Sequence, residues 1–383
     1  MKQFVISKEE FSERVKRLQA IISNTDLDGV LVFSTESEPA GVRYFSDYWP
    51  SFETAAVLVP KEGKPILLIG PESMTYARSR SKIDDIIKMK DFRESSNPDY
   101  PGTTLMDWNE LLNESGIKRL GISGWHMFPH SIYKNIASVT GENNIAEADG
   151  LVREVTIKKS ESELDCLREA ARISELGFEA VLNEIRPGMT EVQLVGIATG
   201  AMLAGGAEST GYPVWCCSGP NSTQAISRPT HRKVQKGEII HFSVGAKVSG
   251  YSASIGRPVV LGSCPGEIRK FMQVGLDAEN MTIDLMRSGM KASEVARKVH
   301  SFITEKGYGD TILYGPAHGC GQMECEYPFV ETSSEFILEQ GMVFMVDVFL
   351  ANSSMGFRWE DGVIITAGKA EELSGYKRQI NII

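Results

Sequence analysis

The sequence predicts an α+β protein in two parts, a smaller α/β domain over residues 1–155 and a larger α+β domain over residues 156–383. Two observations lead to this prediction. Short apolar segments alternate with helical patterns up to about residue 155, as they do in α/β domains. Beyond that point, a long helical pattern is followed by two pairs of apolar segments joined by turns, which indicates two β-hairpins with flanking helices.

The N-terminal part is expected to begin with an amphipathic helix over residues 8–24, because apolar residues recur there at helical spacing with charges between them. Residues 28–33 and 120–122 are short apolar runs and are predicted to be strands. Two further strand patterns, residues 54–59 and 65–69, surround the turn Lys61-Glu62-Gly63-Lys64. This alternation predicts a small α/β domain.

A long helix is predicted from residue 157 to residue 185, in a stretch rich in Glu, Leu and Ala. Near its start, Ser160 is followed three residues later by Glu163, which is the spacing of a capping box. Pro187-Gly188 ends the helix. The capped start of so long a helix places a domain boundary near residue 155.

The C-terminal part contains a weak internal repeat. Arg186-Pro187-Gly188-Met189 is echoed by Arg287-Ser288-Gly289-Met290, 101 positions further on, and each motif lies between two helical patterns. The first copy precedes a predicted hairpin over residues 238–261, and the second precedes another over residues 342–366. The pattern suggests two similar halves that arose by duplication.

The composition restricts the class of protein. The 383 residues suffice for a buried core, and 42% hydrophobic with 23% charged residues is ordinary for a soluble globular protein. Fifty acidic against forty basic residues leave a net charge of −10, which gives nucleic-acid binding no electrostatic support. No apolar run could span a bilayer, and the N-terminal residues place acids where a signal peptide needs an apolar run. We therefore expect a cytoplasmic protein, with neither nucleic acid nor a membrane as a partner.

Six short motifs follow one another along the C-terminal part. They are Ser218-Gly219-Pro220-Asn221-Ser222, Lys236-Gly237-Glu238, Gly245-x4-Gly250-Tyr251, His318-Gly319-x-Gly321, Leu338-Glu339-x-Gly341-Met342-Val343 and Arg358-x-Glu360-Asp361. In kind and order they resemble the family of creatinase, aminopeptidase P, prolidase and methionine aminopeptidase. The resemblance implies a pita-bread domain over residues 156–383, preceded by a smaller creatinase-type α/β domain over residues 1–155.

The metallopeptidases of this family hold two metals with Asp, Asp, His, Glu and Glu. The matching positions here are Ser243, Ser254, His318, Asp347 and Glu360. Two carboxylates are thus replaced by neutral hydroxyls, whereas a bridged pair of divalent cations needs hard oxygen ligands. The expectation is that the centre has lost its metals and that the protein has no metal and no cofactor. A single metal on the remaining three residues stays open.

Two histidines that handle substrate in the family are also replaced, by Ile226 and Cys325. Creatinase is the metal-free enzyme of the family and ectoine hydrolase is a close relative, but creatinase's general base corresponds to Ile226. The resemblance leads us to expect a metal-independent, creatinase-like hydrolase that acts on a C–N bond of a small, cationic, nitrogen-rich substrate. Phe52 matches an aromatic residue that creatinase presents from its partner subunit, which implies a homodimer with the N-terminal domain of one chain near the other chain's site.

Three residues are candidates for the catalytic chemistry. His318 is the histidine retained in the pocket, and imidazole titrates near neutral pH. His241 shares a strand face with Ser243, because side chains alternate along a strand, and could replace the lost base. Glu326 follows the position of the lost histidine and could carry a proton.

The expected substrate-binding residues include Asp347 and Glu360, which would hold a cationic group, and Arg358, which would pair with them or bind a carboxylate. The rest of this set is Phe52, Cys325, Ser243 and Ser254. Simpler roles remain open for several candidates. His241 could be a structural histidine, Cys325 a packing residue or a thiolate nucleophile activated by His318, and the two acids remnants of a metal centre.

Two other functions remain open. One is an Xaa-Pro dipeptidase or aminopeptidase-type metallopeptidase with a degenerate metal site, and the other is a non-catalytic binding module of the same fold. The sequence identifies neither the substrate nor the residue that replaces the missing base at Ile226.

Overall fold

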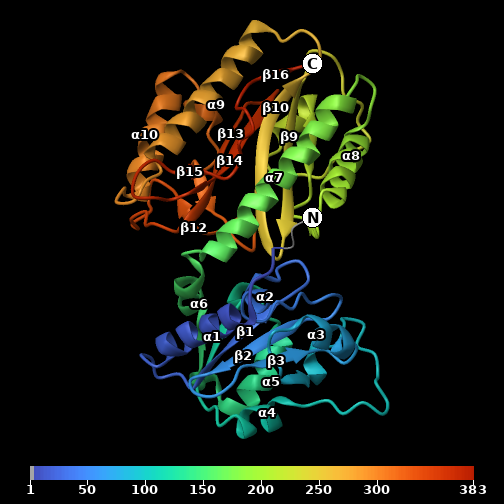
Figure 1. Ribbon diagram of the computed structural model, residues 1–383, viewed down its shortest axis with the longest axis vertical. Helices are drawn as coiled ribbons and strands as arrows, with labels where there is room; N and C mark the ends of the chain where they lie inside the picture. Colours follow the sequence, from blue (N-terminus) through green and yellow to red (C-terminus); the bar gives the residue numbers. More distant parts are fainter. Residues whose placement is uncertain (1–3) are drawn as a thin grey trace. The chain divides into compact units, whose positions relative to one another are not determined.

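The computed structural model describes residues 4–383, which divide into two compact units (Figure 1). Residues 5–156 form the N-terminal unit, and residue 4 joins residues 157–383 in the C-terminal unit. Each unit has its own sheet. Among residues 4–383, no helix is both long enough and apolar enough to cross a membrane.

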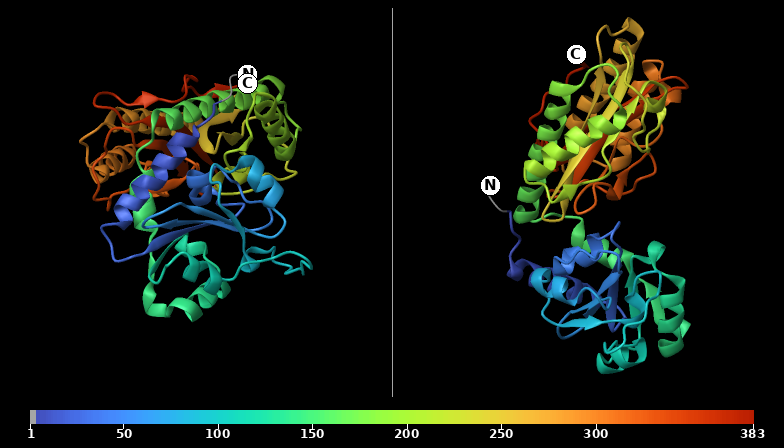
Figure 2. Two further views of the ribbon diagram at one scale, coloured as in Figure 1. Left: turned by 60° about the horizontal axis from the view of Figure 1, so that its bottom comes forward. Right: turned by 90° about the vertical axis from the view of Figure 1, so that its right-hand side faces the viewer.

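The N-terminal unit is a sheet of six strands in the order β4-β3-β2-β1-β5-β6, with helices on both faces (Figure 2). Its elements are α1 (Lys8–Ile22), β1 (Gly29–Ser34), α2 (Ala40–Ser46), β2 (Ala55–Pro60), β3 (Ile66–Ile69), α3 (Met74–Arg80), β4 (Ile86–Lys88), α4 (Trp108–Glu114), β5 (Leu120–Ser123), α5 (His130–Thr140), β6 (Ile145–Glu147) and α6 (Asp149–Thr156). Strand β1 explains why both faces are covered. Val30 and Val32 face the core beneath α1, whereas Leu31 and Phe33 face the core beneath α4 and α5.

The C-terminal unit is built on a sheet of ten strands, whose main path is β12-β11-β13-β14-β10-β9-β7. Its helices are α7 (Glu161–Glu184), α8 (Glu191–Ala204), α9 (Gly266–Leu285) and α10 (Ala292–Glu305). Its strands are β7 (Ser209–Thr210), β8 (Trp215–Ser218), β9 (Ile239–Val248), β10 (Tyr251–Val260), β11 (Ala317–Gly319), β12 (Glu326–Val330), β13 (Val343–Ala351), β14 (Gly356–Ile364), β15 (Glu371–Glu372) and β16 (Asn381–Ile382). Helix α7 packs on β9 and β10, and α9 packs on β13 and β14.

The two predicted hairpins are confirmed as β9–β10 and β13–β14, and the predicted capping box is present at the start of α7. Ser160 accepts a hydrogen bond from the Glu163 amide, and the Glu163 side chain accepts one from the Ser160 amide. This exchange satisfies two amide groups that have no partner within the helix.

The C-terminal unit repeats one arrangement twice. We call α7 to β10 (residues 161–260) the first half and α9 to β14 (residues 266–364) the second half. In the first half the Gly188 amide donates to the Val234 carbonyl, and in the second half the Gly289 amide donates to the Leu338 carbonyl, each at 2.9 Å. Both glycines have positive φ angles, 93° and 89°, which glycine adopts without steric cost. The repeated Arg-x-Gly-Met motif therefore marks the same turn in both halves.

Candidate functional site

The candidate site begins with a row of residues across the middle of the C-terminal sheet. Ser243 on β9 lies opposite Gly256 on β10, Gly256 lies opposite Glu360 on β14, and Glu360 lies opposite Asp347 on β13. Residues directly opposite one another in antiparallel strands have their side chains on the same face. A Cβ atom at Gly256 would come within 2.8 Å of both Ser243 Oγ and Glu360 Cβ, so glycine gives these two side chains room.

His318 joins this row from β11. It lies opposite Met345, two residues before Asp347 on β13, so that its imidazole faces the same side of the sheet. One ligand atom each from His318, Asp347 and Glu360 lies within 4.8 Å of the other two. His318 Nδ1 lies 3.0 Å from the Gly319 carbonyl oxygen, which leaves Nε2 facing Asp347 Oδ2 at 3.9 Å.

The surroundings of His318 favour a positive charge on its ring. Burial lowers the pKa of His318, but contacts with Cys325, Asp347 and the Gly319 carbonyl outweigh burial and raise the pKa to about 9. The negative charge of the pocket therefore attracts a cation to this ring, either a proton or a metal ion, and the two compete for Nε2.

A buried arginine holds Asp347 in place. Arg358 Nε lies 3.0 Å from Asp347 Oδ1, and the guanidinium stacks over the Trp215 ring, 4.4 Å from its centroid. Arg358 Nη2 donates a hydrogen bond of 2.7 Å to Tyr314 Oη, and the Tyr314 hydroxyl donates one of 2.9 Å to Asp347 Oδ2. Of the two roles that the sequence left open for Arg358, pairing with the acids is the one that the structure shows.

Glu324 is a site residue that the sequence analysis did not select. It lies on the loop between β11 and β12, is only 6% exposed, and accepts a hydrogen bond from Ser254 Oγ at 3.1 Å. Its side chain is also hydrogen-bonded to Glu360, and burial raises the pKa of both carboxyls. The one available signal was an acid that follows the His318-Gly319-x-Gly321 motif closely.

These groups line a cavity of about 280 Å³. Its walls come from β8, β11, β12, β13, β14 and the loops beside them: Trp215, Ile226, Tyr314, Gly315, Ala317, His318, Glu324, Cys325, Phe329, Glu331, Asp347, Arg358 and Glu360. Charged groups are thus gathered at the sheet, and large apolar side chains form much of the remaining wall. The volume suits a small substrate.

His241, a predicted catalytic residue, lies apart from these groups. It is fully buried, it is not among the residues that line the cavity, and its ring is 5.5 Å from the Phe349 ring. Neither ring nitrogen makes a hydrogen bond of standard geometry to any residue in the described range, although the Gln224 backbone favours the charged form slightly. Burial and the charge of Arg358 lower the pKa of His241 well below its usual value, so that the ring is neutral at pH 7.

The structure places the other predicted residues as follows. Cys325 is exposed and lines the cavity, whereas the Glu326 carboxylate is held by Lys159 at 2.7 Å. Ser243 and Ser254 lie on the same sheet as the acids but are not among the residues that line the cavity. Phe52 belongs to the N-terminal unit and is 84% exposed.

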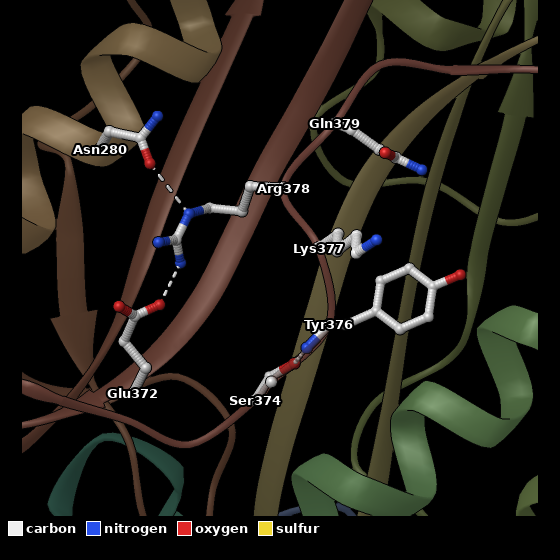
Figure 3. Close-up of a pocket in the computed structure, with 8 residues that line it drawn as sticks. Asn280, Glu372, Ser374, Tyr376, Lys377, Arg378 and Gln379 are labelled. Carbon is white, nitrogen blue, oxygen red and sulfur yellow. Dashed lines mark hydrogen bonds and ion pairs between the residues drawn. The ribbon is translucent and has the colours of Figure 1, made fainter.

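A second hollow, of about 630 Å³, lies over α9 and is lined by Asn280 and by residues 372–379 other than Leu373 (Figure 3). Arg378 lies in this hollow, and two of its three guanidinium nitrogens are engaged. Nε donates to Asn280 Oδ1 at 2.9 Å, and Nη1 pairs with Glu372 and, at 3.4 Å, with Asp361. Arg378 therefore ties the C-terminal segment to α9.

The donor set fits one divalent cation but not two. A bridged pair of metals would require acidic ligands at Ser243 and Ser254, whose hydroxyls are neutral. A single cation requires fewer ligands, and His318, Asp347 and Glu360 offer one nitrogen and two carboxylates at suitable spacing.

Comparison with known proteins assigns both units. Residues 165–367 match the model of metallopeptidase family M24, and residues 14–155 match that of the creatinase/prolidase N-terminal domain. An Xaa-Pro dipeptidase of Pyrococcus furiosus is 24% identical over 370 residues, which cover 96% of this chain and 99% of the dipeptidase.

Solved structures share the fold along the whole chain. The prolidase of Pyrococcus horikoshii OT3 superposes with a TM-score of 0.84 at 23% identity, and the X-Pro aminopeptidase of Thermotoga maritima MSB8 with a TM-score of 0.85 at 24% identity. Each superposition covers 96% of this chain and 99% of the other. The predicted fold is confirmed: an α+β pita-bread domain preceded by a smaller creatinase-type α/β domain.

These relatives correct the expected function. We expected a metal-independent, creatinase-like hydrolase of a small cationic substrate, and that expectation is wrong. Two relatives that span 96% of the chain, from Pyrococcus furiosus and Pyrococcus horikoshii, are named Xaa-Pro dipeptidase, and the matching family is one of metallopeptidases. Two acids of the family centre are replaced here, but His318, Asp347 and Glu360, which could hold a metal ion, remain together.

Proposed function

Because the chain belongs to metallopeptidase family M24, we propose that it is a peptidase of the Xaa-Pro dipeptidase or aminopeptidase type that acts with one divalent cation. The observation that carries this proposal is the cluster of His318, Asp347 and Glu360, which remains assembled on one face of the sheet although two of the five family positions are serines. A histidine and two buried carboxylates that face one another are ligands of the kind that a divalent cation takes.

The three residues would hold the cation through His318 Nε2 and one carboxylate oxygen each of Asp347 and Glu360. A bound divalent cation polarises a peptide carbonyl and lowers the pKa of a bound water. Trp215 and Phe329 offer aromatic surfaces of the kind that suits the pyrrolidine ring of a proline residue. Arg358 places a fixed positive charge at the same cavity, where a substrate carboxylate could bind.

The test is release of proline from Xaa-Pro dipeptides such as Ala-Pro, with Ala-Ala as the matched substrate without proline. We expect cleavage of Ala-Pro by protein loaded with Mn²⁺, loss of cleavage on chelation with EDTA, and recovery when Mn²⁺ is returned. No proline release from any Xaa-Pro dipeptide, with or without Mn²⁺, would contradict the proposal. Binding of the dipeptides without turnover, measured as a thermal shift, would instead support a binding module.

We also propose that the protein acts in the cytoplasm as a homodimer, and that each chain has domains over residues 1–155 and 156–383. In this dimer, Phe52 of one chain would lie near the candidate site of the other. Support comes from Phe52 itself, which is 84% exposed and has a φ angle of 60°. Its amide donates to Glu36 Oε2 at 3.0 Å, which fixes the loop. Light scattering should give the mass of a dimer, and Phe52→Ala should raise KM for the dipeptide; a monomer would contradict the proposal.

A further inference from the structure

We propose that Glu324 supplies the carboxylate that position 254 no longer supplies, so that one divalent cation is held by His318, Glu324, Asp347 and Glu360. The inference rests on the one-cation part of the proposed function. It assigns the ligand role to a residue on the loop between β11 and β12, outside the five positions that the family resemblance provides.

The contacts of Glu324 bring its carboxylate next to Ser254, the position of the missing acid. Ser254 Oγ donates to Glu324 Oε1 at 3.1 Å, so the side chain that replaced an acid now orients another acid. Glu324 Oε1 lies 4.0 Å from His318 Nε2, close to the 3.9 Å that separates Nε2 from Asp347 Oδ2. Two carboxylates, that of Glu324 on the loop and that of Asp347 on β13, therefore lie at similar distances from the His318 imidazole.

The charges of the cluster also favour a divalent cation. The carboxyls of Glu324, Asp347 and Glu360 are each no more than 6% exposed, and one buried guanidinium, Arg358, lies among them. With the three acids ionised and the imidazole neutral, two negative charges remain without a counter-charge. One divalent cation would neutralise them, and buried charges require such compensation.

An unsatisfied hydroxyl points to the same place. Ser243 Oγ is fully buried, lies in the row beside Glu360, and has no hydrogen-bond partner among residues 4–383. Buried polar atoms are rarely left without a partner, so an orphaned oxygen next to the acids indicates that a further group belongs there.

The first half of the C-terminal unit holds the loop that carries Glu324. Lys247 Nζ, which is buried, donates to the Gln322 carbonyl at 2.5 Å and to Ser252 Oγ at 2.7 Å. The Ser252 amide donates to the Gly321 carbonyl at 2.8 Å. The loop is thus tied to the β9–β10 hairpin immediately before Glu324, and the carboxylate is positioned before a cation binds.

Manganese binding tests the inference without reference to activity. Wild-type protein, Glu324→Gln, Ser254→Asp/Glu324→Gln and Glu331→Gln are titrated with Mn²⁺ by calorimetry, and the bound metal is counted by mass spectrometry after dialysis. Glu331 is the matched control, because it is an exposed carboxylate at the rim of the same cavity. Circular dichroism checks that each variant is folded.

We expect one Mn²⁺ per wild-type chain. Residues that only hydrogen-bond to a metal ligand contribute about 10- to 100-fold to metal affinity. Because Glu324→Gln removes a ligand itself, we expect it to weaken Mn²⁺ binding by at least about 100-fold. The double variant should regain most of this loss, and Glu331→Gln should bind as the wild type does. If Glu324→Gln fails to fold, Ser254→Ala should weaken binding by about 10-fold through the lost orienting hydrogen bond.

Each other outcome has a definite meaning. Wild-type affinity in Glu324→Gln, or in Ser254→Ala where that variant replaces it, overturns the role of Glu324 and leaves the proposed function standing. A wild-type chain that binds no Mn²⁺ overturns both. If Mn²⁺ binding depends on Glu324 but the protein cleaves no Xaa-Pro dipeptide, the proposed peptidase activity is overturned and the role of Glu324 stands.

Discussion

The two halves of the C-terminal unit have the same backbone arrangement but different chemistry at the row that crosses the sheet. Among the four hairpin strands, the outer two are β9, which carries Ser243, and β13, which carries Asp347. The inner two are β10, which carries Gly256, and β14, which carries Glu360. The two first-half residues, Ser243 and Gly256, are neutral, whereas the second half contributes two acids, Asp347 and Glu360, and the imidazole of His318. The difference teaches that a duplicated scaffold can be retained while its two copies take different roles.

The scaffold is independent of the ligands for a physical reason. The turns at Gly188 and Gly289 are closed by backbone hydrogen bonds to Val234 and Leu338, and none of these contacts involves a side chain of the row. Exchange of an acid for a serine therefore leaves the fold intact. In the present protein the first half positions a loop through Lys247, while the second half gathers the buried acids.

The largest expected effect is on the second half, at Arg358. Arg358→Ala removes the counter-charge of Asp347, and an uncompensated buried charge typically costs about 3–5 kcal/mol. We expect the free energy of unfolding, measured in urea at pH 7, to fall by about that amount. Arg358→Lys, which keeps the charge, should lose less. A change below about 1 kcal/mol in the alanine variant would show that Asp347 is neutralised in another way.

The next effect separates the two buried histidines. His318→Gln should weaken Mn²⁺ binding by at least about 100-fold, because a ligand is lost from the second half. His241→Gln, the matched change on the first half, should alter the affinity by less than about twofold, since His241 does not line the cavity. Calorimetric titration of both variants measures the contrast. Equal losses of Mn²⁺ affinity in the two variants would contradict the conclusion that only the second half supplies the histidine ligand.

A pH-dependent effect is expected from α9 of the second half. Glu279 is fully buried, neither carboxylate oxygen has a hydrogen-bond partner within residues 4–383, and burial together with Asp361 raises its pKa well above the usual value. The stability that its protonated form contributes is complete below the ordinary pKa and is lost as pH rises through the raised pKa.

Glu279→Gln keeps the shape and cannot ionise. At pH 5 the variant and the wild type should have similar melting temperatures, and at pH 8 to 9 the variant should melt higher. If the wild type instead melted higher than the variant at pH 8 to 9, the ionised Glu279 carboxylate would be stabilised by Arg257 or Arg378, and the prediction would be wrong.

The smallest expected effect is on the first half. His241 is buried without a standard hydrogen bond, and replacement of an unsatisfied polar group by an apolar one of similar size is close to neutral or stabilising. His241→Leu should therefore leave the free energy of unfolding within about 1 kcal/mol of the wild type, as measured by urea denaturation. A loss above about 2 kcal/mol would show that the imidazole makes a contact that stabilises the core.

The sequence could predict those parts of the molecule that follow local rules. Alternation of apolar residues predicted the hairpins, the Ser160–Glu163 spacing predicted a capping box, and the motif resemblance selected His318, Asp347 and Glu360, which the structure brings together. Glu324 obeys no such rule, because the path of its loop depends on bonds from Lys247 and Ser252, far away along the chain. Glu326, two residues further on, was selected instead, and its carboxylate is held by Lys159.

The contact between Lys247 and the loop has a consequence for evolution. Lys247, Ser254 and Glu324 act together: the lysine holds the loop, the serine orients the acid, and the acid gains its place only when both are present. Selection would therefore act on the three positions jointly. Related chains that carry a hydroxyl in place of the acid at position 254 should also carry a carboxylate at 324 and a lysine at 247, whereas chains that retain the acid at 254 are free to vary at both.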